Sequence, residues 1–278
     1  MRKISVLMGV YQEREEHLRQ AVASVLSQTC SDLELLVYLD GEQPAQKKVL
    51  EEFQKEDQRV HILGERVNHG LGYALNRCIE AASGEYLARM DSDDVSEANR
   101  LEKQIAFLEA YAEYDFVGCG ALLFDDAGVY GARKMKAEPV REDFYAYLPF
   151  IHPSVVFRRE VFAGGVRYPE GEQALRCEDL ALFMKLYAGG KKGYNLQEAL
   201  YRYREDQNAF TKKKYRYRLT ESQVRREGYD EMRLFGAKSW LYTVKPLAVG
   251  LIPPLLMQVI KRQTVAKDIG YENTFGNV

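Results

Sequence analysis

The chain has 278 residues, of which 46% are hydrophobic and 29% charged, and its formal net charge at pH 7 is -2. Such a chain can bury a large core, and its balanced charge excludes a general attraction to nucleic acid. The cysteines are too far apart for a zinc knuckle or a disulfide scaffold, which fits a reducing, cytoplasmic location. They stand at Cys30, Cys78, Cys119 and Cys177. No signal peptide is expected, because the first apolar run is short and charged residues follow it at once.

The first third of the chain alternates between short apolar runs and stretches of helical periodicity. The apolar runs, which predict strands, cover 4–8, 33–39, 60–63 and 86–90. Apolar residues at helical spacing follow each run, within 18–26, 49–53, 71–82 and 100–111. This alternation predicts an α/β fold with a mostly parallel sheet flanked by helices. Ligands bind such sheets at the carboxyl ends of the strands, where Asp40 and Asp91 stand.

Three carboxylates, Asp91, Asp93 and Asp94, directly follow the fourth apolar run. Like charges this close raise the free energy unless a cation lies between them, and oxygen ligands suit Mg²⁺ or Mn²⁺. The pattern therefore predicts a divalent-metal site. The alternative is a solvated loop in which Asp94 or Ser96 caps the following helix.

The regular alternation ends after the helix at 100–111. The patterns that follow predict strands at 116–118 and 121–124, a turn at 125–128, a short helix at 142–148 and a β-rich run at 151–157. Glu178 and Asp179 then open a helical pattern that continues to Tyr187. The helix dipole stabilises an ionised carboxylate at this position, so these acids fit a proton acceptor. A plain N-terminal cap is the alternative.

The last part of the chain is basic and aromatic from Tyr201 to Arg226 and apolar from Trp240 onward. The apolar segment 247–260 is too short to span a bilayer, and Pro253 and Pro254 interrupt it. We expect helices that lie on an anionic membrane surface and associate with it peripherally. The alternatives are that the segment packs back on the globular domain or forms a surface for a protein partner.

Seven motifs in chain order resemble those of glycosyltransferase family 2, whose members have the GT-A fold. The motifs lie at 4–12, 25–29, 33–35, 68–76, 91–94, 152–154 and 178–179. The resemblance implies a GT-A domain at 1–210, with a nucleotide-sugar-binding half at about 1–115 and an acceptor-side half at about 116–210. Residues 211–278 would form a helical, basic and apolar extension.

The resemblance also implies an activity, that of an inverting hexosyltransferase. The enzyme would move a single sugar from a nucleotide-sugar donor, a UDP-sugar, to a hydroxyl group of a glycan or lipid-linked acceptor. It would require Mn²⁺ or Mg²⁺ and would work in cell-surface polysaccharide synthesis, in the cytoplasm at the inner face of the cell membrane.

Each site residue takes its role from the same resemblance. Asp40 would bind the nucleotide base, Asp91 the ribose or the metal, and Asp93 the metal on the diphosphate. Asp179 would be the catalytic base, with Glu178 as its neighbour. His152 would lie on the acceptor side. The remaining residues would contact the donor: Val10, Gln12, Asn68, Gly70 and Ser92.

Two departures from the family pattern concern the donor. The chain has Gly-Val-Tyr-Gln at 9–12 where relatives have Pro-Val-Tyr-Asn, and Leu-Asp-Gly-Glu at 39–42 where they have Asp-Asp-Gly-Ser, which leaves the base open. The segment 223–227 lacks the tryptophan of processive synthases, which favours single-sugar addition. A non-catalytic module that binds a nucleotide sugar or a glycan remains the alternative, since it would keep the donor acids and need no base.

Overall fold

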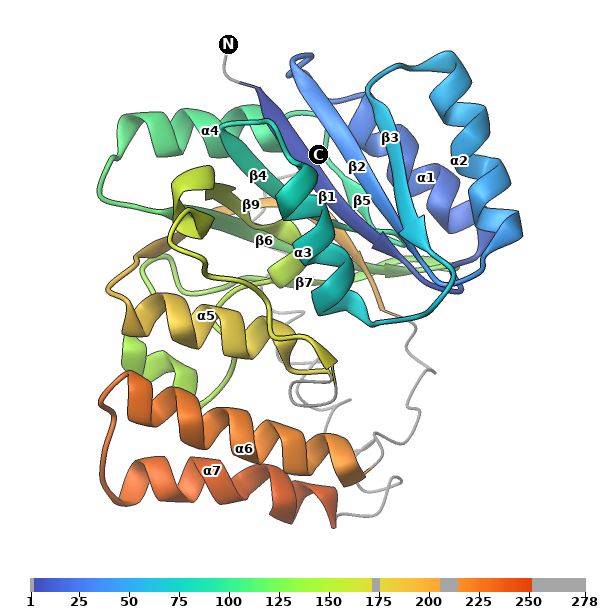
Figure 1. Cartoon of the computed structure of the whole chain (residues 1–278). Coiled ribbons are helices and arrows are strands. Elements are labelled where there is room, and N and C mark those ends of the chain that lie inside the picture. The colour runs from blue at the N-terminus through green and yellow to red at the C-terminus, as the bar shows by residue number, and fades with distance from the viewer. Residues whose placement is uncertain (1–2, 172–175, 206–214, 252–278) are drawn as a thin grey trace.

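The computed structural model describes residues 3–171, 176–205 and 215–251 (Figure 1). The strands are β1 (Ile4–Val10), β2 (Leu33–Asp40), β3 (Val60–Glu65), β4 (Tyr86–Asp91), β5 (Val95–Ser96), β6 (Phe116–Asp125), β7 (Gly128–Arg133), β8 (Val156–Arg158) and β9 (Gly193–Arg204). The α-helices are α1 (Glu15–Leu26), α2 (Pro44–Glu56), α3 (Leu71–Ala81), α4 (Arg100–Ala110), α5 (Glu178–Ala188), α6 (Tyr215–Glu231) and α7 (Ala237–Gly250). Short 3₁₀ helices cover Arg141–Tyr145, His152–Ser154 and Arg159–Phe162.

The strands form one sheet in the order β3-β2-β1-β4-β8-β6-β9-β5, with β7 paired to β6. The first four strands are parallel, as the alternation of strands and helices predicts. Pairing with β8 on either side is antiparallel, whereas β6 and β9 are parallel again. The predicted fold class, a mostly parallel sheet flanked by helices, is confirmed.

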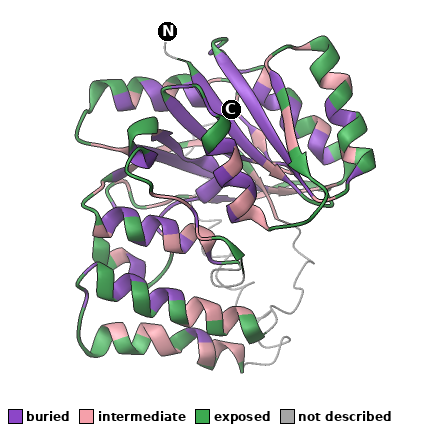
Figure 2. Cartoon of the chain, in the orientation of Figure 1, coloured by how far each residue is buried: buried purple, intermediate pink, exposed green. Residues whose placement is uncertain are grey.

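The sheet is buried on both faces, as Figure 2 shows. One core lies under α1, α2 and α4 and contains Val22, Leu50 and Leu101. The other lies under α3 and α5 and contains Leu75 and Phe183. Because both faces are covered, the edge of the sheet at the carboxyl ends of β1, β2 and β4 is where polar side chains can meet a ligand.

Several predicted elements of the second half differ in the structure. The runs at 116–118 and 121–124 belong to the single strand β6, and the short helix predicted at 142–148 is the 3₁₀ helix Arg141–Tyr145. The β-rich run at 151–157 is a strand only at its end, in β8. It contains the 3₁₀ helix His152–Ser154, because Pro153 has no N–H to donate to a neighbouring strand, and only the short β8 follows.

The C-terminal helices α6 and α7 pack against each other below α5 (Figure 1). Val224, Tyr229, Met232 and Leu234 share the core of α5, so this part of the extension packs back on the domain. In the described part of the chain, no helix is long and apolar enough to cross a membrane. Most of the apolar segment 247–260 lies outside the described residues.

Candidate functional site

The two acids expected at strand ends lie at the same edge of the sheet. Strand β1 lies between β2, which ends at Asp40, and β4, which ends at Asp91. Gly9 of β1 is in register with Asp91, and Val10 with Leu39. The acids are therefore two strand spacings apart across the sheet and two residues apart along it, about 12 Å in all. This distance suits the two ends of one nucleotide-sized ligand.

Asp40 is buried, and its carboxylate holds the turn before α3. Its oxygens accept hydrogen bonds from Asn68 Nδ2 at 2.7 Å, from the His69 N–H at 2.7 Å and from the Gly70 N–H at 2.8 Å. Gly70 has φ = +92°, which a side chain would strain. In this arrangement Asp40 fixes Asn68 and Gly70, two of the expected donor-binding residues, at the end of β2.

The loop after β1 is fixed by Gln43, which the sequence interpretation missed. Gln43 Oε1 accepts the N–H of Gln12 at 2.6 Å, and its Nε2 donates to the carbonyls of Val10 and Asp40, each at 3.0 Å. Gln12 has φ = +54°, an uncommon backbone conformation for a residue with a side chain. Val10, Gln12 and Asp40 are therefore connected by one buried amide.

The acidic motif forms a compact cluster of ligands. Carboxylate oxygens of Asp91, Asp93 and Asp94 lie within 4.8 Å of one another. Burial, followed by the charges of Asp91 and Glu13, raises the pKa of Asp93 to about 7. Burial, followed by the charges of Asp91 and Asp93, raises the pKa of Asp94 well above its usual range. Such shifts mean that negative charge is crowded here without full compensation.

These residues fit a divalent cation. Asp94 is 1% exposed, and its Oδ2 atom has no hydrogen-bond partner among the described residues. A buried carboxylate oxygen without a donor is unfavourable, and a hard cation would satisfy it together with the oxygens of Asp91 and Asp93. The cap expected as the alternative is absent from the described structure, because Asn99 precedes α4 and Asp94 Oδ1 accepts the Arg204 N–H instead. Ser92, in the middle of the motif, is buried.

Arg89 lies beneath the acidic motif as a buried counter-charge. Its side chain is 1% exposed, and its guanidinium contacts the Asp91 carboxylate and the Met90 carbonyl oxygen. The Asp91 N–H donates to the hydroxyl of Tyr201 at 3.2 Å. Asp91 is therefore fixed through both its backbone and its carboxylate.

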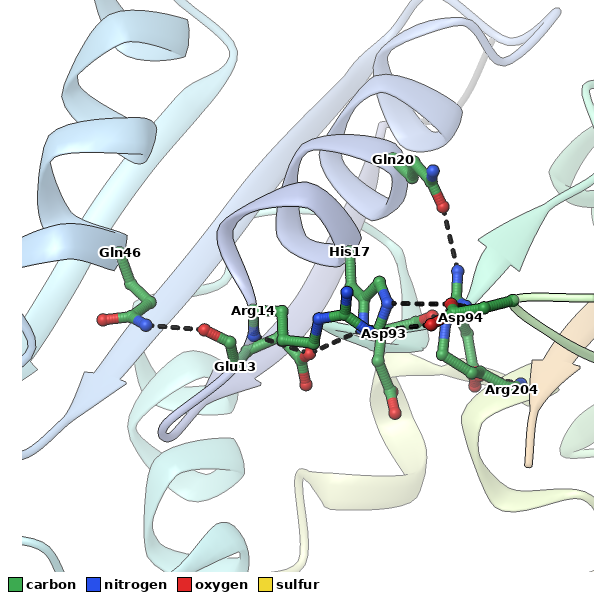
Figure 3. Close-up of polar contacts among 9 residues, drawn as sticks. Glu13, Arg14, His17, Gln20, Gln46, Asp93, Asp94 and Arg204 are labelled. Atoms are coloured by element: carbon green, nitrogen blue, oxygen red, sulfur yellow. Dashed lines mark hydrogen bonds and ion pairs between the residues drawn. The ribbon is translucent and has the colours of Figure 1, made fainter. Parts of the chain in front are cut away.

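A second arginine, Arg204, lies on the other side of the motif at the end of β9. Its side chain lies beside Asp94 and reaches Gln20 of α1, as Figure 3 shows. In the same close-up, Arg14 and His17 lie at the start of α1 near Asp93. Both side chains contact Asp126 in the turn between β6 and β7, at 2.8 Å for Arg14 and 3.4 Å for His17.

The candidate base residues lie in the first turn of α5. Glu178 and Asp179 are its first two residues, as predicted, and Asp179 Oδ1 accepts the N–H of Leu180 at 2.7 Å. Burial and then the charge of Asp179 raise the pKa of Glu178. A raised pKa means that Glu178 ionises less readily than an exposed glutamate does.

Tyr168 is a buried residue of the loop before α5. Burial raises its pKa, Arg89 opposes that shift, and the charges of Asp179, Glu178 and Asp91 each raise it further. The Tyr168 hydroxyl and His152 Nε2 form a hydrogen bond of 2.7 Å.

His152 is buried, and burial followed by the charge of Arg89 lowers its pKa well below the usual range. Its imidazole is therefore neutral at pH 7 and acts as a hydrogen-bonding partner of Tyr168. Asn76 of α3 holds the backbone of Tyr168, accepting its N–H at 3.0 Å and donating to its carbonyl at 2.9 Å. The residue expected on the acceptor side is thus linked through Tyr168 to α3.

Sequence reasoning missed Gln43, Arg89, Tyr168 and Arg204. Arg89 had a usable signal, because a charged residue inside an apolar strand needs a buried partner, and Asp91 follows two positions later. Arg204 had a weaker one, since it belongs to a basic run that resembles a solvated surface. The other two carry no local pattern.

The fold is the GT-A fold. Solved structures share the fold, among them S. aureus TarS in complex with UDP-GlcNAc, with a TM-score of 0.67 and 18% identity over 90% of this chain and 71% of that one. The mannosyltransferase PcManGT from Pyrobaculum calidifontis, in complex with GDP-Man and Mn²⁺, has a TM-score of 0.60 and 16% identity, covering 100% of this chain and 76% of that one.

Sequence comparison gives the family. Residues 5–165 match the model of glycosyl transferase family 2. The putative glycosyltransferase EpsE of Bacillus subtilis (strain 168) is 32% identical over 264 residues, which are 95% of this chain and 94% of EpsE. The amylovoran biosynthesis glycosyltransferase AmsE of Erwinia amylovora is 27% identical over 263 residues, or 92% and 97% of the two chains. The chain belongs to glycosyltransferase family 2, and the resemblance seen in its motifs is confirmed.

Proposed function

We propose that the protein transfers a single sugar from a UDP-sugar to a hydroxyl group of a glycan or lipid-linked acceptor, with inversion at the anomeric carbon. One observation carries the proposal: the carboxylates of Asp91, Asp93 and Asp94 lie within 4.8 Å of one another after β4, and a second pair of acids, Glu178 and Asp179, opens α5. A one-step displacement needs a metal site for the leaving group and a proton acceptor for the attacking hydroxyl, both facing one shared site.

On the donor side, Asp93, Asp91 and Asp94 would hold Mn²⁺ or Mg²⁺. The ion supplies Lewis-acid stabilisation for the negative charge that develops on the departing diphosphate. Asp40, through the turn at Asn68 and Gly70, shapes the pocket for the nucleotide base, and Ser92 and the loop from Val10 to Gln12 border it. The UDP-GlcNAc bound by TarS supports a UDP-sugar, and the GDP-Man and Mn²⁺ bound by PcManGT support a metal-dependent nucleotide sugar in general.

On the acceptor side, Asp179 would accept the proton of the attacking hydroxyl. It lies in the first turn of α5, where the helix dipole favours a carboxylate. Glu178 would assist from the next position, where its raised pKa fits a hydrogen-bonding role. His152, neutral and bonded to Tyr168, would line the acceptor pocket. An inverting transfer needs one base and no covalent nucleophile.

Biologically, we propose a role in cell-surface polysaccharide synthesis, which the name of the relative AmsE supports. The enzyme would work in the cytoplasm at the inner face of the cell membrane. Phe235, Trp240 and Leu241, around the turn between α6 and α7, are 70%, 69% and 57% exposed. Exposed apolar side chains with Lys238 and Lys245 nearby are suited to an anionic lipid surface. The extension at 211–278 would therefore attach the domain at 1–210 peripherally to the membrane.

The test is a screen of nucleotide sugars with and without Mn²⁺, followed by the variants Asp179→Asn and Glu178→Gln. Asp179→Asn should lower turnover by about 10²-fold or more with little change in donor affinity, because only the proton acceptor is lost. Glu178→Gln is the matched control and should lower it less. Near-normal transfer by Asp179→Asn, or a product that keeps the anomeric configuration of the donor, would refute the assignment. Donor binding without any product would instead identify a binding module.

A further inference from the structure

We propose that Arg204 is a positioning residue that holds the acidic motif in its metal-binding conformation, and that Asp126 anchors it there. The inference rests on the proposed metal-dependent function and adds to it a residue more than a hundred positions away in sequence. Arg204 is the last residue of β9. The strand β5, which follows the acidic motif directly, pairs with β9, so the end of β9 lies against the motif.

The contacts of Arg204 with the motif are made by its backbone and its side chain together. Its N–H donates to Asp94 Oδ1 at 2.6 Å, and its Nε donates to the carbonyl oxygen of Asp93 at 2.9 Å. The first contact orients the carboxylate of Asp94. The second fixes the backbone of Asp93, whose side chain carries another carboxylate of the motif. A guanidinium has five donors and no acceptor, so Arg204 cannot itself ligate a cation.

The far end of the guanidinium is held in place by two other elements. Nη1 donates to Asp126 in the turn between β6 and β7, and Nη2 donates to Gln20 of α1, both at 2.9 Å. The guanidinium also lies over the ring of Phe124, 4.3 Å from its centroid. The side chain is only 10% exposed. A planar group that is bound at every edge and stacked on a ring has one orientation, so the Asp93 peptide it contacts is fixed as well.

Charge alone predicts the opposite effect of Arg204 on metal binding. A cation beside the acidic motif repels a divalent ion, so deleting it would tighten metal binding if its charge were all that mattered. A positioning role predicts weaker binding after substitution, because the ligands lose their fixed geometry. Partners behind metal ligands typically contribute about 10- to 100-fold to affinity. The sign of the change therefore separates the two roles.

The experiment measures Mn²⁺ affinity by the electron paramagnetic resonance signal of the free ion, on the full chain and without substrate. Arg204→Lys keeps the charge and the backbone N–H but loses the fork that reaches three elements at once. We expect the Mn²⁺ dissociation constant to rise about 10-fold in this variant. Arg204→Met, which also removes the repulsive charge, should still bind more weakly than the wild type.

Two further variants control for folding. Asp126→Asn, at a side chain that is 67% exposed, leaves Arg204 intact, removes the charge of its anchor and should raise the dissociation constant by a smaller factor. Arg133→Lys is the matched control, because Arg133, at the end of β7, also pairs with an acid and lies over a ring. The acid is Glu205, at 2.9 Å, and the ring is that of Tyr203 on β9. It should bind Mn²⁺ as the wild type does, and thermal unfolding should show all four variants folded.

Two results would overturn the proposal in different ways. If the wild type binds Mn²⁺ and both Arg204 variants bind it equally well or more tightly, Arg204 does not position the motif, and the proposed function stands. The same conclusion follows if Arg204→Lys fails to fold and Asp126→Asn binds Mn²⁺ as tightly as the wild type. If the wild type binds no Mn²⁺, the metal dependence of the proposed function is wrong, and this inference is wrong with it.

Discussion

Glu34 should make the free energy of unfolding fall in acid, and the substitution Glu34→Gln should remove its share of that fall. The side chain is 7% exposed at the start of β2, away from the acidic motif. Burial alone would raise its pKa, but hydrogen bonds to its Oε1 atom outweigh that effect and lower the pKa to about 2. The donors are the Ser5 hydroxyl at 2.6 Å, the Ser83 hydroxyl at 2.7 Å and the Ser83 N–H at 2.8 Å.

The size and sign of the effect follow from linkage. The pKa of Glu34 falls from 4.5 to about 2 on folding. At about 1.4 kcal/mol for each pKa unit, the ionised carboxylate contributes about 3 kcal/mol to the free energy of unfolding. A depressed pKa means that this contribution is complete above pH 4.5 and is lost as the pH falls toward 2. The wild type should therefore lose about 3 kcal/mol in that window from this residue.

Urea denaturation of the wild type and of Glu34→Gln, at pH 7 and again near pH 3, measures the contribution. Glutamine imitates the protonated acid, so the variant should be less stable by about 3 kcal/mol at pH 7, and the gap should narrow steadily in acid. Comparing the two chains at each pH cancels the titration of all other groups. A constant gap between pH 7 and 3 would refute the reasoning, because the Glu34 carboxylate would then have the same pKa in both states.

Three further outcomes are expected. Asp93→Ala should abolish Mn²⁺-dependent donor binding in calorimetry while the fold remains intact; equal donor affinity with and without Mn²⁺ in the wild type and the variant would contradict the metal role. Asp40→Ala should lower the free energy of unfolding by about 2–4 kcal/mol, since three donors lose their acceptor, and the exposed Glu42→Ala is the control. Substituting both Trp240 and Leu241 by Ser should reduce flotation with anionic vesicles, and binding of the wild type should weaken as salt rises; equal flotation of both chains would remove the membrane proposal.

The first half of the fold was predictable because its information is local. Each apolar run and each helical pattern in the first third of the chain is complete within about a dozen residues, and parallel order follows from their alternation. The second half lacks this property. The parallel pairing of β6 with β9 joins Phe116 to Gly193, and no local pattern indicates such a distant partner. Residues around His152 look β-rich, yet Pro153 turns them into a 3₁₀ helix.

The site divides in the same way. The proposed ligands and base stand in short motifs, so their roles can be predicted from the local sequence: Asp91, Asp93, Glu178 and Asp179. The residues that hold these side chains in place cannot be predicted from the local sequence. The bond between Arg204 and the Asp93 carbonyl spans 111 positions, and it exists only because β5 and β9 pair in a particular register. Ligands can be read from composition, whereas their supports depend on register and packing.

The hydrogen bonds between Asn76 and the backbone of Tyr168 have a consequence for recombination between relatives. They join α3 to the loop before α5, which lie in the proposed nucleotide-sugar and acceptor halves. Gly72 approaches the same loop so closely that an added Cβ would lie 2.5 Å from the Pro169 oxygen. A chimera with a crossover near residue 116, made to exchange acceptor specificity, therefore needs asparagine at position 76 and glycine at position 72. Acceptor halves should be exchangeable only between parents that match at both positions.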